Sequence, residues 1–365
     1  MSTSAPSSFA DAEAAVAALE RAGRQIAGCS LAGLDFSGRD LSRVHLREVD
    51  LSQAVLSGCN LQGAVFERCK LPAATFADAD LTATQWQSCD LLGALFQRAK
   101  GERISMAECL LCEADAGSLQ WTSAMFDRCD LSGARFVVAR LLRSDAHQCR
   151  FEGTDFTRAA LHRFTAMDAD LASARFEGSD LTQAYLAGAK LAGQRLGSCV
   201  LAMAQFNRAD LTGADFSGAD LQQAQFQQAA LDGAKLEGAR GQYLRFDEAR
   251  MARARLGGAV FPQCSFTRAD LSGAQLQGLH APQSIFSHAI CRAAQFTRAV
   301  VVDGDFSHAD LGDADCSQAD FSGANLHRVI EERTRWTDAK RRGSFATDPA
   351  LARAEDFRPA VAPHA

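Results

Sequence analysis

The chain has 365 residues, of which 47% are apolar and 22% are charged, and its formal net charge is −6. This composition predicts a folded protein and excludes a surface so acidic or so basic that charge alone would identify its partner. No run of about 18 apolar residues is present, so the sequence predicts no transmembrane helix. The start of the chain also lacks the pattern of a secretory signal, and we therefore expect a cytoplasmic protein.

The first predicted element is an amphipathic helix over residues 9–22. Ser8 can cap its N-terminus together with Asp11, and Gly23 follows as a stop signal. We assign residues 1–23 to an N-terminal segment with this capping helix. Three of its apolar side chains would cover the open end of the structure that follows, namely Phe9, Val16 and Leu19.

A five-residue repeat occupies most of the chain after this helix. Residues 209–221 read Ala-Asp-Leu-Thr-Gly-Ala-Asp-Phe-Ser-Gly-Ala-Asp-Leu, and a large residue, here called the centre, recurs at every fifth position from Ile26 to Leu326. Leu or Phe occupies 47 of these 61 centres, and a small residue precedes most centres by two positions. Because neither a helix nor a flat strand has a period of five, the chain must turn a corner at each repeat, with the centre and the small residue facing inward.

This pattern resembles the pentapeptide repeat family, whose motif is Ala-(Asp/Asn)-Leu-X-X. The resemblance implies an all-β solenoid, a right-handed quadrilateral β-helix in which four repeats form one coil. The sequence supports such a coil, since 16 of the 19 Phe centres fall on two opposite faces and 20 of the 28 Leu centres on the other two. Residues 24–328 would then form about 15 coils in a rod roughly 73 Å long.

The motif fades after Leu326, and we assign residues 329–365 to a C-terminal cap and flexible tail. Three residues of this segment could cover the last coil, namely Val329, Ile330 and Trp336. From Arg341 onward the chain is polar and contains Pro349, Pro359 and Pro363, as is typical of a flexible segment.

The 12 cysteines are predicted to be structural, because all except Cys112 take inward positions, where they replace Ala or Leu as small buried residues. His288 and His308 share one outward column, where two stacked imidazoles could hold a metal weakly, but Arg268 and Arg328 in the same column oppose this. No catalytic motif is present. We therefore predict no enzymatic activity, no catalytic or cofactor-binding residue, no metal and no cofactor.

Charge bears on the best-known activity of the family, in which quinolone-resistance members resemble B-form DNA and bind DNA gyrase. A duplex of about 73 Å carries roughly 43 phosphate charges, whereas residues 24–326 carry 35 acids and 29 bases. The uninterrupted repeat also leaves no room for the projecting loops of the gyrase-protecting members. One outward column alternates in sign and predicts a ladder of ion pairs: Asp50, Lys70, Asp90, Leu110, Asp130, Arg150, Asp170, Lys190 and Asp210.

Two candidate interaction surfaces lie toward the C-terminus, the end at which several family members dimerise. Apolar residues at outward positions and in the predicted cap define a candidate interface: Ile285, Ile290, Val300, Val302, Val329, Ile330 and Trp336. A basic segment defines a candidate basic patch: Arg328, Arg333, Arg335, Lys340, Arg341 and Arg342. Such a segment can bind nucleic acid or an acidic partner, but it is more often a solvated cap, and we expect no direct nucleic-acid binding.

These features predict a rigid, non-enzymatic scaffold or adaptor that binds a protein partner through its sides or its C-terminal end and can form a homodimer there. The resemblance adds a bacterial context, since long members occur beside toxin-loading proteins of type VI secretion. Two alternatives are a DNA mimic that binds DNA gyrase or another topoisomerase, and a purely structural, self-assembling rod. No membrane partner is predicted, and the sequence does not identify the protein partner.

Overall fold

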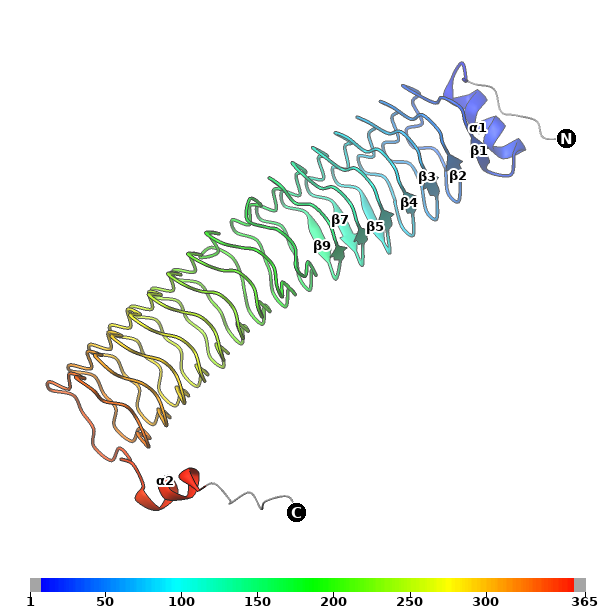
Figure 1. Cartoon of the computed structure of the whole chain (residues 1–365). Helices are drawn as coiled ribbons and strands as arrows, with labels where there is room; N and C mark the ends of the chain where they lie inside the picture. The colour runs from blue at the N-terminus through cyan, green and yellow to red at the C-terminus, as the bar shows by residue number, and fades with distance from the viewer. Residues whose placement is uncertain (1–7, 358–365) are drawn as a thin grey trace, which may run out of the picture. The chain divides into compact units, whose positions relative to one another are not determined.

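The computed structural model describes residues 8–357. The chain divides into two compact units, Met1–Asp210 (unit 1) and Leu211–Ala365 (unit 2), which are described separately. Within each unit the backbone winds in successive coils that stack on one another (Figure 1). From Gln25 onward, each paired residue lies beside the residue 20 positions later, as Asp50 does with Lys70 and Gln275 with Gln295. Four five-residue repeats therefore complete one coil, and the predicted β-solenoid is confirmed.

Strands of three residues mark two faces of unit 1, and all of them pair in parallel. One sheet has the order β1-β2-β3-β4-β6-β8-β10 and the other the order β5-β7-β9. The strands are β1 (Gln25–Ala27), β2 (His45–Arg47), β3 (Val65–Glu67), β4 (Gln85–Gln87), β5 (Lys100–Glu102), β6 (Ser105–Ala107), β7 (Gln120–Thr122), β8 (Met125–Asp127), β9 (Arg140–Leu142) and β10 (Asp145–His147). Elsewhere in the solenoid, isolated bridges at every fifth residue continue the same pairing.

Backbone hydrogen bonds join successive coils at most corners. The N–H of Leu51 donates to the carbonyl of Lys70 (2.7 Å), and the N–H of Gln53 donates to the carbonyl of Pro72 (2.9 Å). The second residue after most centres has a left-handed backbone, with φ of 58° at Gln53 and 66° at Gly213. This conformation turns the chain through each corner, and it explains why glycine is frequent at that position.

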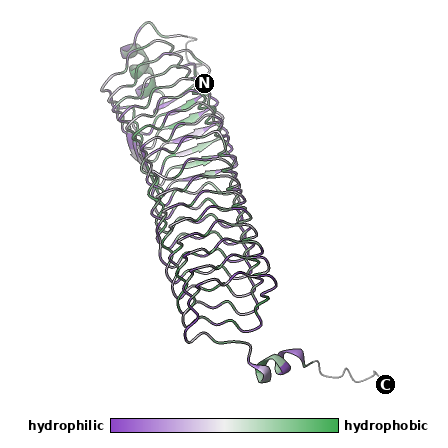
Figure 2. Ribbon diagram, turned by 90° about the vertical axis from the view of Figure 1, so that its left-hand side faces the viewer, coloured by the Kyte–Doolittle hydropathy of each residue, from purple (hydrophilic) through white to green (hydrophobic). Residues whose placement is uncertain are grey.

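The interior is filled by columns of like side chains, as the sorting of Phe and Leu centres predicted. In unit 2 the rings of successive Phe centres stack with centroids 4.6 to 5.0 Å apart, in the column Phe226, Phe246, Phe266, Phe286 and Phe306. Hydrophilic and hydrophobic residues are interspersed along the coils (Figure 2). Burial raises the pKa of the Cys59 thiol to about 11 and that of Cys264 to about 12, as expected for structural cysteines.

At the N-terminal end of unit 1, helix α1 (Ala12–Arg21) lies against the first coil (Figure 1). Its cap differs from the prediction, because Asp11 accepts the N–H of Ala14 at 2.8 Å. Ser8 instead pairs with Ser30 of the first coil. The helix begins at Ala12, three residues later than predicted. The side chains that α1 buries are Ala12, Ala15 and Leu19, whereas Phe9 and Val16 are half-buried.

In unit 2 the coil conformation extends past residue 328, the predicted end of the repeats. Asn325 pairs with Phe345, and Ile330 pairs with Asp310, because this pairing uses backbone groups and does not require a Leu or Phe centre. A second helix, α2 (Pro349–Asp356), follows within the segment predicted to be flexible. Pro359 and Pro363 lie outside the described residues. Neither α1 nor α2 has the length and apolar character that a membrane-spanning helix requires.

Candidate functional site

Helix α2 is attached to the last coils of unit 2 by polar contacts. It has eight residues and buries none of its side chains. Asp348 caps its N-terminus by accepting the N–H groups of Ala350 (2.7 Å) and Leu351 (3.3 Å). Because a helix of this length is not stable alone in water, its order depends on the groups that bind it to the solenoid.

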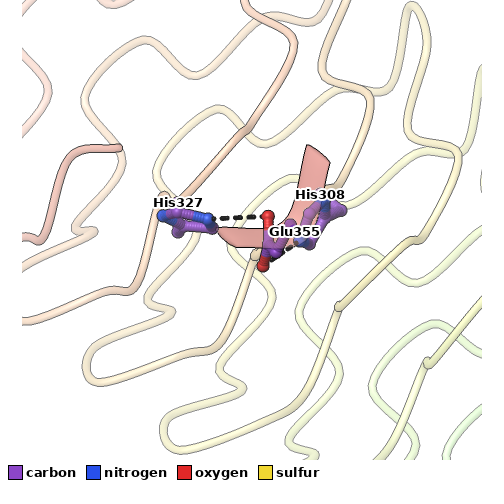
Figure 3. A group of neighbouring side chains, drawn as sticks. All are labelled: His308, His327 and Glu355. Carbon is purple, nitrogen blue, oxygen red and sulfur yellow. Dashed lines mark hydrogen bonds and ion pairs between the residues drawn. The ribbon is translucent and has the colours of Figure 1, made fainter. Parts of the chain in front are cut away.

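The contacts converge on one carboxylate near the C-terminal end of α2. Glu355 lies between two imidazoles, with Oε1 3.3 Å from His308 Nε2 and Oε2 3.3 Å from His327 Nε2 (Figure 3). Arg328 Nε also lies 3.3 Å from Oε2 of Glu355. The Nη2 of Arg328 donates to Asp356 at 2.5 Å and to the carbonyl of Ala352 at 3.1 Å. Three donor side chains of the solenoid therefore bind two adjacent acids of α2.

The solenoid corners place these donors. His308 and Arg328 occupy the left-handed corner position of successive coils, with φ of 60° and 53°. The His308 ring stacks on His288 of the preceding coil, with centroids 4.7 Å apart, as predicted for this column. His327 precedes Arg328 and is 5% exposed. Its Nδ1 accepts the N–H of Asp348 at 3.1 Å, which orients the ring toward α2.

These contacts favour ionised carboxylates. Partial burial raises the pKa of Glu355, but hydrogen bonds from His327 and His308 outweigh this effect and lower its pKa below the ordinary value. The hydrogen bond from Arg328 lowers the pKa of the Asp356 carboxyl, and the same bond raises the pKa of Arg328. The corner is therefore electrostatically complementary to paired carboxylates.

The same cluster contains the donor types of a metal site, since ligand atoms of His308, His327 and Glu355 lie within 4.8 Å of one another. Its hydrogen bonds oppose that use. Nδ1 of His327 accepts a backbone N–H, so the proton of the neutral ring is on Nε2, the atom that would have to bind the metal. Arg328 also places a positive charge beside the shared carboxylate. The arrangement fits carboxylate binding better than metal binding.

We expect α2 to detach in acid. The pKa of Glu355 is lowered from an ordinary value of 4.5, so its stabilising contribution is present above about pH 4.5 and is lost as the pH falls through the lowered pKa. The lowered pKa of Asp356 acts in the same direction. Helical Cα chemical shifts over residues 349–356, followed by NMR from pH 7 to about pH 2, should decline toward coil values. Retention of these shifts at about pH 2 would contradict the electrostatic attachment.

The structure does not gather the predicted apolar interface of residues 285–302 on one surface. Each of these residues flanks a centre, and the 20-residue register places Ile285 and Ile290 on two successive faces of the coil. Val300 and Val302 flank the centre Val301 on the face opposite that of Ile290. Ile285 and Ile290 are exposed by 42% and 43%, as isolated apolar side chains.

The structure does bring the predicted cap residues together on the last coil. Ile330 is 46% exposed, and Val329 and Trp336 are half-buried. The Trp336 ring packs edge-on against Phe321, with centroids 5.0 Å apart, and Arg341 lies 4.4 Å above it. Phe345, which the sequence analysis did not single out, is 65% exposed on the same coil.

The predicted basic patch consists largely of paired cations. Arg333 binds Asp313 (2.8 Å from Nη2), Arg335 binds Asp315 (2.9 Å), and Lys340 lies 3.5 Å from Asp320. Each pair joins residues that are 20 positions apart in the sequence, so the 20-residue period of the coil could have identified these partners. Arg341 binds Glu331 at 2.9 Å within the last coil. Arg328, which the sequence analysis placed in the basic patch and in the column of His288 and His308, binds Glu355 and Asp356 of α2.

Family profiles and solved structures show what the chain resembles. The chain matches a profile described as pentapeptide repeat region over residues 25–96. It matches a second profile, described as pentapeptide repeats (8 copies), over residues 124–163, 167–201, 199–238, 245–287 and 289–328. No curated protein is significantly similar to it in sequence.

Three solved structures illustrate the similarity. A trypsin-treated form of QnrB1, a plasmid-mediated fluoroquinolone resistance protein, is 18% identical with a TM-score of 0.40, over 46% of this chain and 91% of that chain. HetL, a pentapeptide repeat protein involved in heterocyst differentiation regulation in the cyanobacterium Nostoc sp. strain PCC 7120, is 22% identical with a TM-score of 0.20, over 87% and 97%. Rfr23 from the cyanobacterium Cyanothece 51142 is 18% identical with a TM-score of 0.24, over 31% and 88%.

Proposed function

Since the chain belongs to the pentapeptide repeat family, we propose that it is a non-enzymatic scaffold that binds a protein partner at the C-terminal end of unit 2. The capping helices differ in a way that supports this proposal, because α1 buries apolar side chains and α2 does not. Helix α1 buries Ala12, Ala15 and Leu19 at the N-terminal end of unit 1. Helix α2 buries no side chain at the C-terminal end of unit 2, and among the described residues its acidic side chains contact His308, His327 and Arg328.

The observation that carries the proposal is the open edge of the last coil. One coil earlier, Leu311, Cys316 and Phe321 each donate their N–H to a carbonyl 19 residues later, at 2.8 to 2.9 Å. Within residues 8–357, the corresponding N–H groups of Glu331 and Trp336 find no acceptor. An unpaired edge of this kind is a template for an added strand from another chain.

Side chains at this edge also suit a protein partner. Ile330 and Phe345 expose apolar surface, by 46% and 65%. Exposed aromatic side chains are typical of protein interfaces. A second copy of the chain is one occupant, and the adaptor role in type VI secretion that the family resemblance implies would use the same edge.

The DNA-mimic alternative receives less support, because paired acids do not form a continuous anionic stripe. In unit 1, Asp130 lies 3.4 Å from Arg150, and Asp170 lies 3.4 Å from Lys190. The alternating column predicted from the sequence therefore forms ion pairs at these two positions, and mixed ladders of this kind cancel much of the field that a phosphate backbone would present.

The Ile330→Lys/Phe345→Lys double variant tests the edge. We expect it to lose at least tenfold in partner recovery by affinity capture from the source organism, because charged edge residues oppose strand addition. Ile290→Lys is the matched control, since Ile290 lies in the column of Ile330 and is equally exposed, at 43% against 46%. Quantitative mass spectrometry measures the recovery, and light scattering measures any dimer.

The outcomes separate the alternatives. Loss of a partner or of a dimer in the double variant, with retention in Ile290→Lys, supports binding at the edge. Equal recovery by all three proteins would contradict it. Recovery of DNA gyrase that is insensitive to both variants would support the DNA-mimic alternative instead.

A further inference from the structure

We propose that His308, His327 and Arg328 form a binding site for an acidic segment of a partner protein, and that Glu355 and Asp356 of α2 occupy this site in cis. The existence of a partner rests on the function proposed above. The site itself rests on the contacts of α2, so the two can fail separately.

The contacts define the chemistry of the ligand. His308 and His327 each lie 3.3 Å from a different oxygen of one carboxylate, while Arg328 reaches the next acid along the helix. Arg328 also donates to the backbone carbonyl of Ala352 of α2, at 3.1 Å. The site therefore recognises a helix that ends in two consecutive acidic residues. The guanidinium stabilises both the carboxylate and the negative end of the helix dipole.

Helix α2 meets this requirement but leaves much of the available contact surface unused. Beside it lies an open hollow of about 500 Å³, lined in part by Phe345, Asn325 and Leu351. Leu351 of α2 is 48% exposed and Phe357, which follows the helix, is 73% exposed, so these apolar side chains contribute little to the attachment of α2. A partner helix with the same acidic end and a larger apolar residue toward Phe345 would make the same ion pairs and bury additional apolar surface.

Helix α2 can occupy the site despite its few contacts because it is covalently linked to the solenoid. An attached segment competes at a millimolar effective concentration, without needing high intrinsic affinity. Removing its two charges should free the site for a ligand in solution. We therefore expect a Glu355→Gln/Asp356→Asn variant to bind an acidic peptide at least tenfold more tightly than the unaltered chain does.

The experiment uses full-length proteins and a synthetic peptide of residues 346–357, added up to about 2 mM to match the effective concentration. NMR signals of His308 and His327 report binding at pH 7. The expected result is a saturating shift in the double variant and a response at least tenfold weaker in the unaltered chain. A peptide carrying Gln and Asn in place of its two acids should give no shift. Absence of a shift in the double variant at the highest concentration, or equal shifts in both proteins, would overturn the proposal.

Two further variants locate the contact. In the double-variant background, Arg328→Gln should abolish peptide binding, because it removes the group that binds both the acid and the helix carbonyl. Arg333→Gln is the matched control, since Arg333 occupies the same corner position of its repeat, with φ of 55°, and pairs with Asp313 instead. Equal loss in both variants would indicate nonspecific charge attraction and would overturn the site. The peptide experiment does not involve a host protein. Its result is therefore independent of whether the affinity capture at the coil edge recovers a partner.

Discussion

The Phe266→Ala variant is expected to destabilise unit 2 by about 3–5 kcal/mol. Phe266 is fully buried, and its ring stacks between Phe246 at 5.0 Å and Phe286 at 4.6 Å. The substitution removes both stacking contacts and leaves a cavity that the coils above and below cannot fill, because backbone hydrogen bonds hold them at a fixed spacing. Urea denaturation followed by circular dichroism measures the loss.

The effect should be local as well as large, because each coil of a solenoid contacts only its neighbours. Amide hydrogen exchange should accelerate most in the coils that contain Phe246, Phe266 and Phe286. Ile285→Ala is the control, since it shortens an apolar side chain next to this column that points outward and is 42% exposed. We expect the control to cost less than about 1 kcal/mol. Equal losses in the two variants would show that the Phe column does not determine stability.

The sequence predicts the solenoid because its period constrains every coil in the same way. Once the centre is placed at every fifth residue, the 20-residue coil fixes which residues are neighbours, and Asp50 lies beside Lys70 as the arithmetic requires. The same arithmetic places His308 directly after His288 in one column, and their rings stack. Features that depend only on translation from coil to coil can therefore be read from the sequence.

The corner conformation is harder to predict, because the sequence obscures it. The second residue after the centre has a positive φ in coil after coil, including 56° at Arg158 and 58° at Gln223. Arginine and glutamine carry no signal for the left-handed region, which ordinarily costs a non-glycine residue about 1–2 kcal/mol. Only the frequent glycines at this position, such as Gly213, would have indicated it. The stacked coils impose the corner on whichever residue occupies it.

The candidate site could be predicted only in part, because it joins a periodic element to a nonperiodic one. The positions of His308 and Arg328 follow from the repeat. Glu355 follows from no repeat, since it lies 47 residues beyond His308 and reaches it only because α2 folds back along the last coils. The sequence shows that the arginines of this column oppose metal binding by its histidines. It does not show that Glu355 lies beside them, so it could not predict a site for carboxylates.

At one centre, a substitution that restores the repeat motif should disrupt the packing. Gly101 occupies a position at which Leu is the commonest residue, so Gly101→Leu would restore the motif. We expect this variant to destabilise unit 1 by about 1–3 kcal/mol. A Cβ at this position would lie 2.8 Å from Cδ1 of Ile104 and 3.0 Å from the backbone carbon of Leu81. Ile104 is fully buried and already fills the space that a larger centre would need.

The Gly101→Leu/Ile104→Ala double variant tests this compensation of volume, which the sequence indicates by pairing a small centre with a large neighbour. Removing Ile104 alone should create a cavity and cost about 2–4 kcal/mol. In the double variant the new Leu fills part of that cavity, so its loss should be smaller than the sum of the two single losses by about 1–2 kcal/mol. Recovery should be incomplete, because the contact with the Leu81 backbone remains. Urea midpoints of the four proteins measure the coupling, and strictly additive losses would show that Gly101 and Ile104 do not share one volume.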